Sequence, residues 1–378
     1  MHGLTMVQME GVALFGALMI SLLILINARA IGAKLQIMDH PDSYRKNHRK
    51  ATPLVGGLAI MVPVIAWASV CLIWTQSLDF KLLEAILLCG AGATLVGYAD
   101  DQSSTSPSSR LLSLILLLLI ALVIDPELIP VQFNWGSFEP TRIPQWFGVA
   151  FVAFGMAGYV NAVNMADGQN GVVTGLFVIW ATCLMIVTGG ITTNVAQVLA
   201  ETVLVTFLFN MAGRVFLGDS GSYGVAFVFG LLAINAHNHW GVSAETIVVW
   251  FFIPVVDCIR LIVARALRGQ APSEGDRNHF HHRLQDRIGE TAGLLTYLGA
   301  VGVSSVTASL MPHTSLVCMV VLAAFYFSFA WLTEVDSNVG KVEDGGESQS
   351  ETAGKDDAAS TGIANVVKFD GKNTTWRE

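Results

Sequence analysis

Long apolar runs alternate with short polar segments along most of this chain. A helix needs roughly 20 mostly apolar residues to cross a bilayer, and many of the runs approach or reach that length. We expect eleven such helices, at residues 7–27, 54–74, 82–98, 111–125, 146–162, 171–189, 195–209, 221–236, 244–267, 293–311 and 315–333. The pattern predicts an all-α, polytopic integral membrane protein in which residues 1–335 form the transmembrane domain.

Composition supports the membrane assignment. Of the 378 residues, 53% are hydrophobic and 13% are charged, whereas soluble domains carry about a quarter charged residues. This excludes a water-soluble enzyme, and we expect no nucleic-acid partner. The five cysteines lie inside apolar runs without metal-ligand spacing, so we interpret them as small hydrophobic residues. Residues 336–378 are rich in Gly, Ser, Asp and Glu, which predicts a disordered tail.

Basic residues indicate the orientation of the chain. They gather in the odd-numbered loops and in the tail, whereas the even-numbered loops hold only Lys81 and Arg142. By the positive-inside rule, the N-terminus is then outside, and the odd-numbered loops and the C-terminus are cytoplasmic. The first six residues contain no Lys or Arg, so we expect the first run to be a retained helix and not a cleaved signal peptide.

Every polar cluster with catalytic potential also falls in an odd-numbered loop. The first of these loops contains Lys46 and His48 and is followed by Gly56-Gly57 at the start of a helix. A basic loop that obeys the positive-inside rule would explain the charges, but neither His48 nor the glycines. Glycines there allow close approach of a ligand or of another backbone. Charge and motif position therefore select the same face.

Two adjacent acids, Asp100 and Asp101, end the third apolar run. A solvated helix end is one interpretation. However, acids are unfavourable beside the negative end of a helix dipole, and they are costly at a membrane boundary unless they are paired or bind a metal. We therefore favour a bound cation.

Two later loops carry amides and acids. Asn161, Asn164 and Asp167 are spaced three residues apart and could share one helical face, with Asn170 close behind. A turn-rich loop would have a similar composition, but such groups also suit a metal or a nucleotide. Asp219 lies in the segment FLGDSGS before an apolar helix, where it could be an N-cap or part of an anion site made by free backbone N–H groups.

The segment after the ninth apolar run is the sharpest cluster, because three histidines, His279, His281 and His282, lie between Arg277 and Arg283. A merely polar or pH-sensitive loop is one alternative. Zinc is another, although no cysteine is near and no second cluster has zinc spacing. A phosphate site suits the arginines better. Oxygen ligands for magnesium together with cationic donors for phosphate are the groups that phosphoryl transfer requires.

Taken together, these motifs resemble the polyprenyl-phosphate N-acetylhexosamine-1-phosphate transferases over about residues 39–285. The resemblance rests on five motifs in order: Arg45-Lys46-x-His48 with Gly56-Gly57, Asp100-Asp101, NAVNMADG, FLGDSGS and NHFHHRL. Within this family, the chain is most similar to the bacterial undecaprenyl-phosphate N-acetylglucosamine-1-phosphate transferases. Many bacterial relatives carry a second acid where this chain has Asn170, so that position is not expected to be a catalytic acid or a metal ligand.

The resemblance implies an enzyme of the inner (cytoplasmic) membrane that transfers N-acetylglucosamine 1-phosphate from UDP-GlcNAc to undecaprenyl phosphate, releases UMP and starts a cell-surface polysaccharide such as O-antigen. It implies Mg²⁺, or Mn²⁺, as the cofactor and leaves a homodimer open. It places Asp100, Asp101, Asp219 and His279 at the reaction centre, with Asp219 and Asn164 as metal ligands. The substrate-binding residues that it implies are Lys46, His48, Asp167, Asn170, Asn210, Arg265, His281, His282 and Arg283.

Two alternatives come from other functional classes. A transporter could use Asp257, Arg260 and Arg265 as a relay, but no internal repeat is visible and the acids gather at one face. A structural subunit would not need motif-bearing loops on one side. Within the enzyme class, another UDP-N-acetylhexosamine stays open as the donor. The bulky UDP-muramyl-pentapeptide is disfavoured, because that branch tends to carry three consecutive histidines and Phe280 interrupts the run here.

Overall fold

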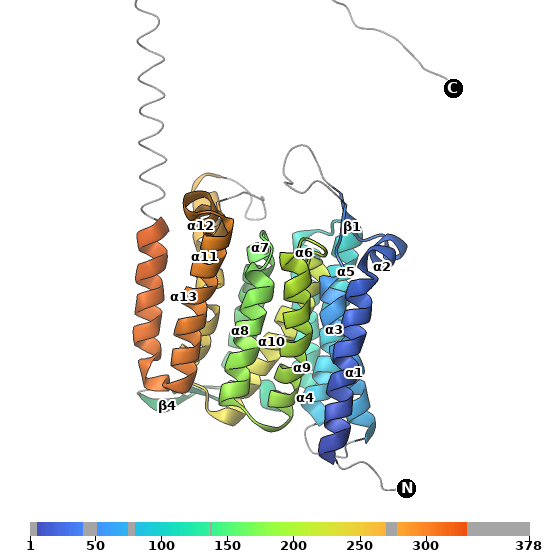
Figure 1. Cartoon of the computed structure of the whole chain (residues 1–378). Coiled ribbons are helices and arrows are strands. Elements are labelled where there is room, and N and C mark those ends of the chain that lie inside the picture. Colours follow the sequence, from blue (N-terminus) through green and yellow to red (C-terminus); the bar gives the residue numbers. More distant parts are fainter. Residues whose placement is uncertain (1–5, 41–50, 75–79, 137, 270–277, 331–378) are drawn as a thin grey trace, which may run out of the picture. The chain divides into compact units, whose positions relative to one another are not determined.

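The computed structural model describes residues 6–40, 51–74, 80–136, 138–269 and 278–330 (Figure 1). Contacts divide the chain into two units, Met1–Ala330 and Trp331–Glu378, and the second lies outside the described residues. The predicted disordered tail therefore stays a prediction. The longer helices are α1 (Met6–Ile26), α3 (Gly56–Trp74), α5 (Ala91–Gln102), α6 (Pro107–Ile124), α7 (Gln145–Ala166), α8 (Val172–Val187), α9 (Gly190–Met211), α10 (Gly218–Trp240), α11 (Ala244–Leu267) and α13 (Glu290–Leu310).

Shorter elements connect these helices. α2 (Ala28–Leu35), α4 (Phe80–Ala85) and α12 (Phe280–Ile288) are short helices, and one π-turn, Ile86–Gly90, joins α4 to α5. The described part also contains a last helical span, Pro312–Ala330, and two antiparallel strand pairs. β1 (Met38–Asp39) pairs with β2 (Thr52–Pro53), and β3 (Gln132–Trp135) pairs with β4 (Phe138–Arg142).

Eight helices among the described residues are long and apolar enough to cross a membrane, or nine if the bent pair α1–α2 counts as one span. The polytopic helical prediction is confirmed, whereas the count of eleven stays a prediction. Each of the eleven expected segments does contain a helix. α1 is followed by a bend of 73° into α2, α8 has only 16 residues, and α10 is not among the eight.

Local sequence signals set several helix ends. The Ser106 side chain accepts a hydrogen bond from the Ser109 N–H at 3.2 Å, and Pro107 occupies the first position of α6. Ser243 caps α11 in the same way through the Thr246 N–H. Gly241 ends α10 with a φ of 67°, a conformation that glycine adopts without steric cost. These caps satisfy donors and acceptors that a helix end leaves unpaired.

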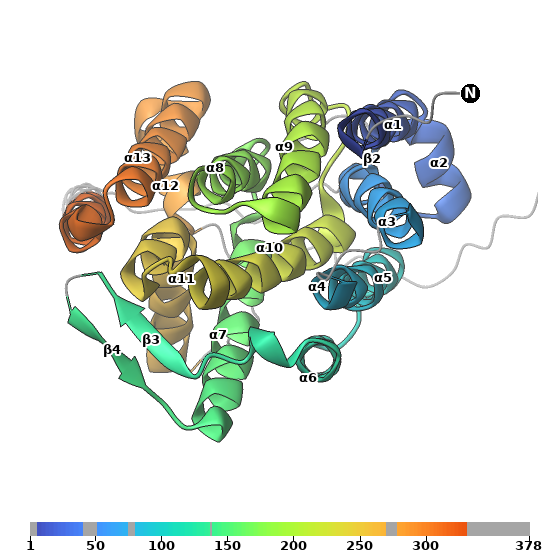
Figure 2. The same ribbon diagram turned by 90° about the horizontal axis from the view of Figure 1, so that it is seen from below.

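The centre of the fold is α10, because 18 of its 23 residues are buried. Viewed from below, it crosses the middle of the bundle between α9 on one side and α7 and α5 on the other (Figure 2). Its N-terminal segment meets two neighbouring helices at glycines. A Cβ on Gly57 of α3 would collide with the backbone of Gly221, and one on Gly97 of α5 would collide with the Asp219 carbonyl group. The sequence left open whether Gly56-Gly57 approach a ligand or a backbone, and the structure shows a backbone.

Hydrogen bonds fix the same contact. The Gly56 N–H donates to the Phe216 carbonyl at 2.9 Å, and the Gly57 N–H donates to the Leu217 carbonyl at 2.8 Å. The first N–H groups of α3, which have no partner within their own helix, therefore donate to the loop that leads into α10. These bonds hold the FLGDSGS segment against the N-terminus of α3.

Replacing Gly57 with alanine is expected to lower the thermal unfolding midpoint in detergent by about 5 °C or more, because the added methyl group would meet backbone atoms that cannot move independently of α3 and α10. Gly158→Ala in α7 is the matched control, since a Cβ there meets nothing within 4 Å. Equal midpoints for the two variants would contradict the close packing of α3 on α10.

Candidate active site

The candidate residues gather at one end of the helical unit. The C-terminal ends of α5, α7, α9 and α11, the N-terminal end of α10, and α12 supply them. Figure 1 shows α2, β1 and α12 at this end, whereas β4 lies at the opposite end. The prediction that the polar motifs share one face is therefore confirmed for the described residues. The cytoplasmic identity of that face stays a prediction.

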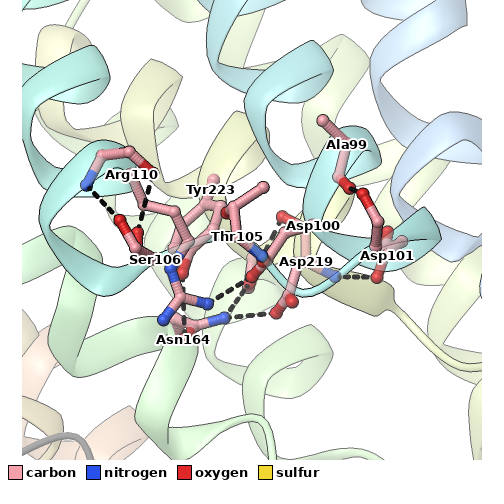
Figure 3. A network of polar contacts seen from close by, with 12 residues as sticks. Ala99, Asp100, Asp101, Thr105, Ser106, Arg110, Asn164, Asp219 and Tyr223 are labelled. Atoms are coloured by element: carbon pink, nitrogen blue, oxygen red, sulfur yellow. Dashed lines mark hydrogen bonds and ion pairs between the residues drawn. The ribbon is translucent and has the colours of Figure 1, made fainter.

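Asp100 lies on the last turn of α5 and is held by the segment that follows it (Figure 3). Its Oδ1 accepts hydrogen bonds from the Thr105 N–H at 2.7 Å and from the Thr105 hydroxyl at 2.8 Å. Its Oδ2 forms an ion pair with Arg110 on the first turn of α6. Asp100 is 8% exposed, so it is a nearly buried carboxylate that one arginine neutralises. In the sequence Arg110 is one of the basic residues of the odd-numbered loops, and this role was not predicted.

Asp101 points to a different partner, the start of α10. Its Oδ1 accepts the Asp219 N–H at 2.8 Å and its Oδ2 accepts the Ser220 N–H at 3.0 Å. The free backbone donors of the FLGDSGS segment, which the sequence analysis offered as an anion site, therefore bind a carboxylate of the protein. This corrects that alternative: in this structure Asp101 is the anion at the N-terminus of α10.

The backbone N–H of Asp219 meets Asp101, whereas its side chain points toward α7 (Figure 3). The Asn164 amide nitrogen donates to Asp219 Oδ1 at 2.6 Å and to the Ser222 hydroxyl at 2.8 Å. The Asn164 amide oxygen accepts from the Tyr223 hydroxyl at 3.3 Å. Both ends of the Asn164 amide are thus engaged, so in this arrangement Asn164 orients Asp219. Its assignment as a metal ligand stays a prediction.

The Asp100 and Asp219 carboxyl groups also contact each other. Two carboxylates in contact repel unless a proton or a cation lies between them, and Arg110 supplies only one positive charge. No group of three or more His, Cys, Asp or Glu side chains in the described part of the chain could hold a metal ion. Magnesium, however, commonly uses one or two carboxylates and completes its shell with water and substrate phosphate. The oxygen-only pair Asp100 and Asp219 fits that requirement.

The loop after α7 is tied to the end of α9. Asn210 is 5% exposed, and its Oδ1 accepts the Gly171 N–H at 2.7 Å, while its amide nitrogen donates to the Val215 carbonyl at 3.0 Å and to Asn170 Oδ1 at 3.3 Å. The predicted nucleotide contacts Asn170 and Asn210 are therefore neighbours. Asn210 also joins three segments of the site, so the structure gives it a scaffold role beside any contact with substrate.

Asp167 follows the last residue of α7 and is partly buried. Its carboxylate makes no hydrogen bond with any residue that the structure describes. Burial, with a smaller contribution from the Asp101 charge, raises the pKa of Asp167 to about 7. A partly buried acid that makes no hydrogen bond among the described residues, three residues beyond Asn164, has its hydrogen-bonding capacity available for a ligand.

The histidine segment packs against this same turn. A Cβ on Gly168 would lie 2.8 Å from His281 Nε2 and 3.1 Å from His282 Nε2, so only a glycine leaves the imidazoles room. The His281 ring is 3% exposed, and its Nε2 has no hydrogen-bond partner among the described residues. Burial, followed by the neighbouring histidines, lowers the pKa of His281. Two motifs that lie about a hundred residues apart in the sequence are therefore in contact.

Asp257 of α11 holds the histidine segment in place. It pairs with Arg260 at 2.8 Å and with His279 at 3.1 Å. Asp257 and Arg260 entered the sequence-based alternatives only as parts of a transporter relay, and this contact was not predicted. The available sequence signal was an acid and a base three residues apart inside an apolar helix. It could not reveal His279, because that residue lies in another element.

The remaining predicted residues divide into two groups. Lys46 and His48 lie outside the described residues, so their assignment stays a prediction. Arg265 is 3% exposed near the end of α11. Arg283 donates to the Ala330 carbonyl at 3.3 Å, which directs one of its N–H groups toward the helical span Pro312–Ala330.

Comparison with known proteins agrees with the motifs. Residues 83–237 match the model of glycosyl transferase family 4. The chain is 25% identical over 324 residues to the undecaprenyl-phosphate alpha-N-acetylglucosaminyl 1-phosphate transferase of Salmonella typhi, covering 80% of this chain and 85% of that protein. For the Escherichia coli K12 protein of the same name the values are 25%, 81% and 87%.

A third relative comes from Bacillus subtilis. The probable undecaprenyl-phosphate N-acetylglucosaminyl 1-phosphate transferase of Bacillus subtilis 168 is 28% identical, over 72% of this chain and 76% of its own. The resemblance that the motifs predicted is confirmed. The family match includes Asp100, Asp219 and the loop after α7, but it ends before α11 and the histidine segment.

Proposed function

We propose that the chain, a relative of these family 4 transferases, transfers N-acetylglucosamine 1-phosphate from UDP-GlcNAc to undecaprenyl phosphate. The observation that carries the proposal is the contact between the Asp100 and Asp219 carboxyl groups, beside Arg110 and Asn164, at the end of the helical unit where the histidine segment also lies. This arrangement combines acidic oxygens with cationic and N–H donors, which is the chemistry that a transfer between two phosphates needs.

In the proposed reaction an oxygen of the lipid phosphate attacks the β-phosphorus of UDP-GlcNAc. A new P–O–P bond forms, the bond between the β-phosphorus and the bridging oxygen breaks, and UMP leaves with that oxygen and the electron pair. The bond between the sugar and its phosphate oxygen stays intact, so the anomeric configuration is retained. The product is the lipid pyrophosphate that would start a cell-surface polysaccharide such as O-antigen.

Since every reacting group is an anion, the main task of the site is to offset charge and to align the attack. A Mg²⁺ or Mn²⁺ ion held by Asp100 and Asp219 would supply positive charge to the phosphates. Arg110 adds a cation beside Asp100, Asn164 fixes the direction of the Asp219 carboxylate, and Asp101 fixes the first turn of α10. These residues therefore preorganise the site before substrate arrives.

Asp100 is poorly suited to act as a general base. Thr105 and Arg110 already donate to both of its oxygens, and a phosphate monoester has a second pKa of about 6, so the lipid phosphate is mostly ionised at neutral pH. The contacts support a role in placing the cation or the nucleophile.

The same proposal includes the topology. The basic residues place the N-terminus outside and the C-terminus in the cytoplasm, with eleven crossings of the inner membrane and the carboxylate site at the cytoplasmic face. All the motif-bearing ends that the structure describes lie together, which supports one catalytic face. A reporter fused to the C-terminus that proves periplasmic would contradict this orientation.

The direct test uses purified protein in detergent with radiolabelled UDP-GlcNAc and undecaprenyl phosphate. We expect labelled lipid and an equal amount of UMP. Detergent removes any membrane compartment, so turnover there separates an enzyme from a transporter. Absence of lipid product under these conditions, with the acceptor present and Mg²⁺ added, would overturn the proposal.

Donor choice gives a sharper prediction. We expect UDP-GlcNAc to exceed UDP-muramyl-pentapeptide in kcat/KM by at least ~100-fold, a difference of about 2.7 kcal/mol in transition-state binding. The reason is that Phe280 interrupts the run of three histidines that the pentapeptide branch tends to carry. UDP-GalNAc is the closer competitor, because it differs at one hydroxyl group. Comparable kcat/KM for the pentapeptide donor would refute the assignment to the hexosamine branch.

A further inference from the structure

Asp257 is a buried carboxylate whose described partners are all hydrogen-bond donors. It is 6% exposed. Its Oδ1 accepts from Arg260 Nη2 at 2.8 Å and from the Tyr326 hydroxyl at 2.8 Å. Its Oδ2 accepts from His279 Nδ1 at 3.1 Å and from the Phe280 N–H at 3.2 Å. The two oxygens thus serve different elements: Oδ1 faces α11 and the span Pro312–Ala330, and Oδ2 faces the histidine segment.

Arg260 and Tyr326 lock this arrangement. Arg260 Nε donates to the Tyr326 hydroxyl at 2.7 Å, and Arg260 Nη2 donates to the Asn278 carbonyl at 2.6 Å. The carboxylate, the guanidinium and the phenol therefore form a closed network that contacts the backbone on both sides of His279. A buried network in which every member is satisfied holds its groups in a single arrangement.

The orientation of the His279 ring follows from this network. A carboxylate can only accept, so the proton lies on His279 Nδ1, and Nε2 is the nitrogen left to meet a ligand. Nε2 makes no hydrogen bond with any residue in the described part of the chain. The ring stacks on His281 with centroids 5.5 Å apart and planes 17° apart, and His281 in turn meets the turn at Gly168. Through His281, His279 is therefore linked to the loop after α7, which follows Asn164 of the carboxylate site.

We propose that Asp257 is a positioning residue that acts through His279, fixing its ring and its protonation so that Nε2–H faces the donor's pyrophosphate. This inference rests on the proposed function, because it takes a pyrophosphate as the ligand. Phosphate oxygens only accept hydrogen bonds, so a ring that already donates through Nδ1 meets them as an imidazolium. The Asp257 carboxylate compensates that charge.

Asp257→Asn is the informative substitution because it changes charge and not size. An asparagine has only one accepting oxygen, whereas both oxygens of Asp257 accept hydrogen bonds from donors. If that oxygen serves Arg260 and Tyr326, the NH₂ group faces His279 Nδ1 and the Phe280 N–H. Nδ1 must then accept, so the ring switches to the neutral tautomer that is protonated only on Nε2.

We expect Asp257→Asn to lower kcat by about 10- to 100-fold, as supporting partners of functional groups typically do, with KM for UDP-GlcNAc changed by less than about threefold. Asp125→Asn is the matched control, since Asp125 is also a buried acid, 4% exposed, but caps Pro126–Leu128 by accepting the Glu127 N–H near β3. That variant should keep kcat. A loss of kcat in both variants that follows their unfolding midpoints would reduce Asp257 to a structural role.

A second measurement needs no turnover. In protein labelled with ¹⁵N-histidine, the wild-type His279 signal should show a protonated Nδ1, and Asp257→Asn should move that proton to Nε2. An unchanged His279 signal would refute the inference even if the wild type proved inactive on UDP-GlcNAc, a result that would by itself refute only the proposed function. An active wild type with an Asp257→Asn variant of equal kcat would refute the inference alone.

Discussion

Asp219→Asn is expected to lower kcat for lipid-product formation by at least ~1000-fold, which corresponds to about 4 kcal/mol of transition-state stabilisation. Asp219 is the acid that contacts Asp100 and accepts a hydrogen bond from the Asn164 amide nitrogen. The amide variant keeps the size of the side chain and leaves the backbone N–H that binds Asp101 in place. It removes one of the two negative charges that make the pair a cation site. The loss should therefore appear in turnover and metal affinity while the fold persists.

The control for this variant is an acid at the opposite end of the helical unit. Glu245 is 7% exposed, and both of its carboxylate oxygens lie 3.1 Å from the Gly136 nitrogen. Glu245→Gln keeps an accepting oxygen and should retain kcat. Steady-state kinetics at saturating Mg²⁺, with thermal unfolding of both variants, checks the prediction. If Asp219→Asn kept the wild-type kcat, the assignment of Asp219 to the reaction centre would be wrong.

The helical framework could be predicted from hydrophobicity because apolar length is the dominant constraint in a membrane. All eleven expected segments contain helices. Three features escaped the pattern. The bend between α1 and α2 falls at Asn27, within continuous helical sequence. The β3–β4 hairpin is too short to leave a periodic signal. α12 is a nine-residue helix that buries Phe280 and Leu284, and its polar composition resembles that of a loop.

The candidate site was predictable in its residue types and its face, but not in its pairings. Asp100 and Asp101 are adjacent in sequence, yet one pairs with Arg110 and the other caps α10, because successive helical positions point in directions about 100° apart. Composition could not reveal that Asp101 fills the anion site at the FLGDSGS segment. Nor could spacing show that Asp257 contacts His279, since that contact depends on how α11, α12 and the last span pack.

Removal of divalent metal is expected to abolish lipid-product formation, and added Mg²⁺ or Mn²⁺ should restore it. The physical reason is the charge balance of the site. Asp100 and Asp219 contact each other with Arg110 as the paired cation, and the lipid phosphate and the UDP-sugar bring several further negative charges. One arginine cannot offset that total, whereas a divalent ion between the carboxylate pair and the phosphates can.

The measurement is product formation after exhaustive EDTA treatment, followed by titration with Mg²⁺, Mn²⁺ or Ca²⁺. Magnesium and manganese should restore turnover, and calcium should restore less, because its larger shell suits the small carboxylate pair poorly. Electron paramagnetic resonance of Mn²⁺ provides a readout that is independent of catalysis: the bound signal should be present in the wild type and in Glu245→Gln but much weaker in Asp219→Asn. Full activity in the chelated enzyme would contradict the two-carboxylate cation site, and equal Mn²⁺ binding by wild type and Asp219→Asn would place the ion elsewhere.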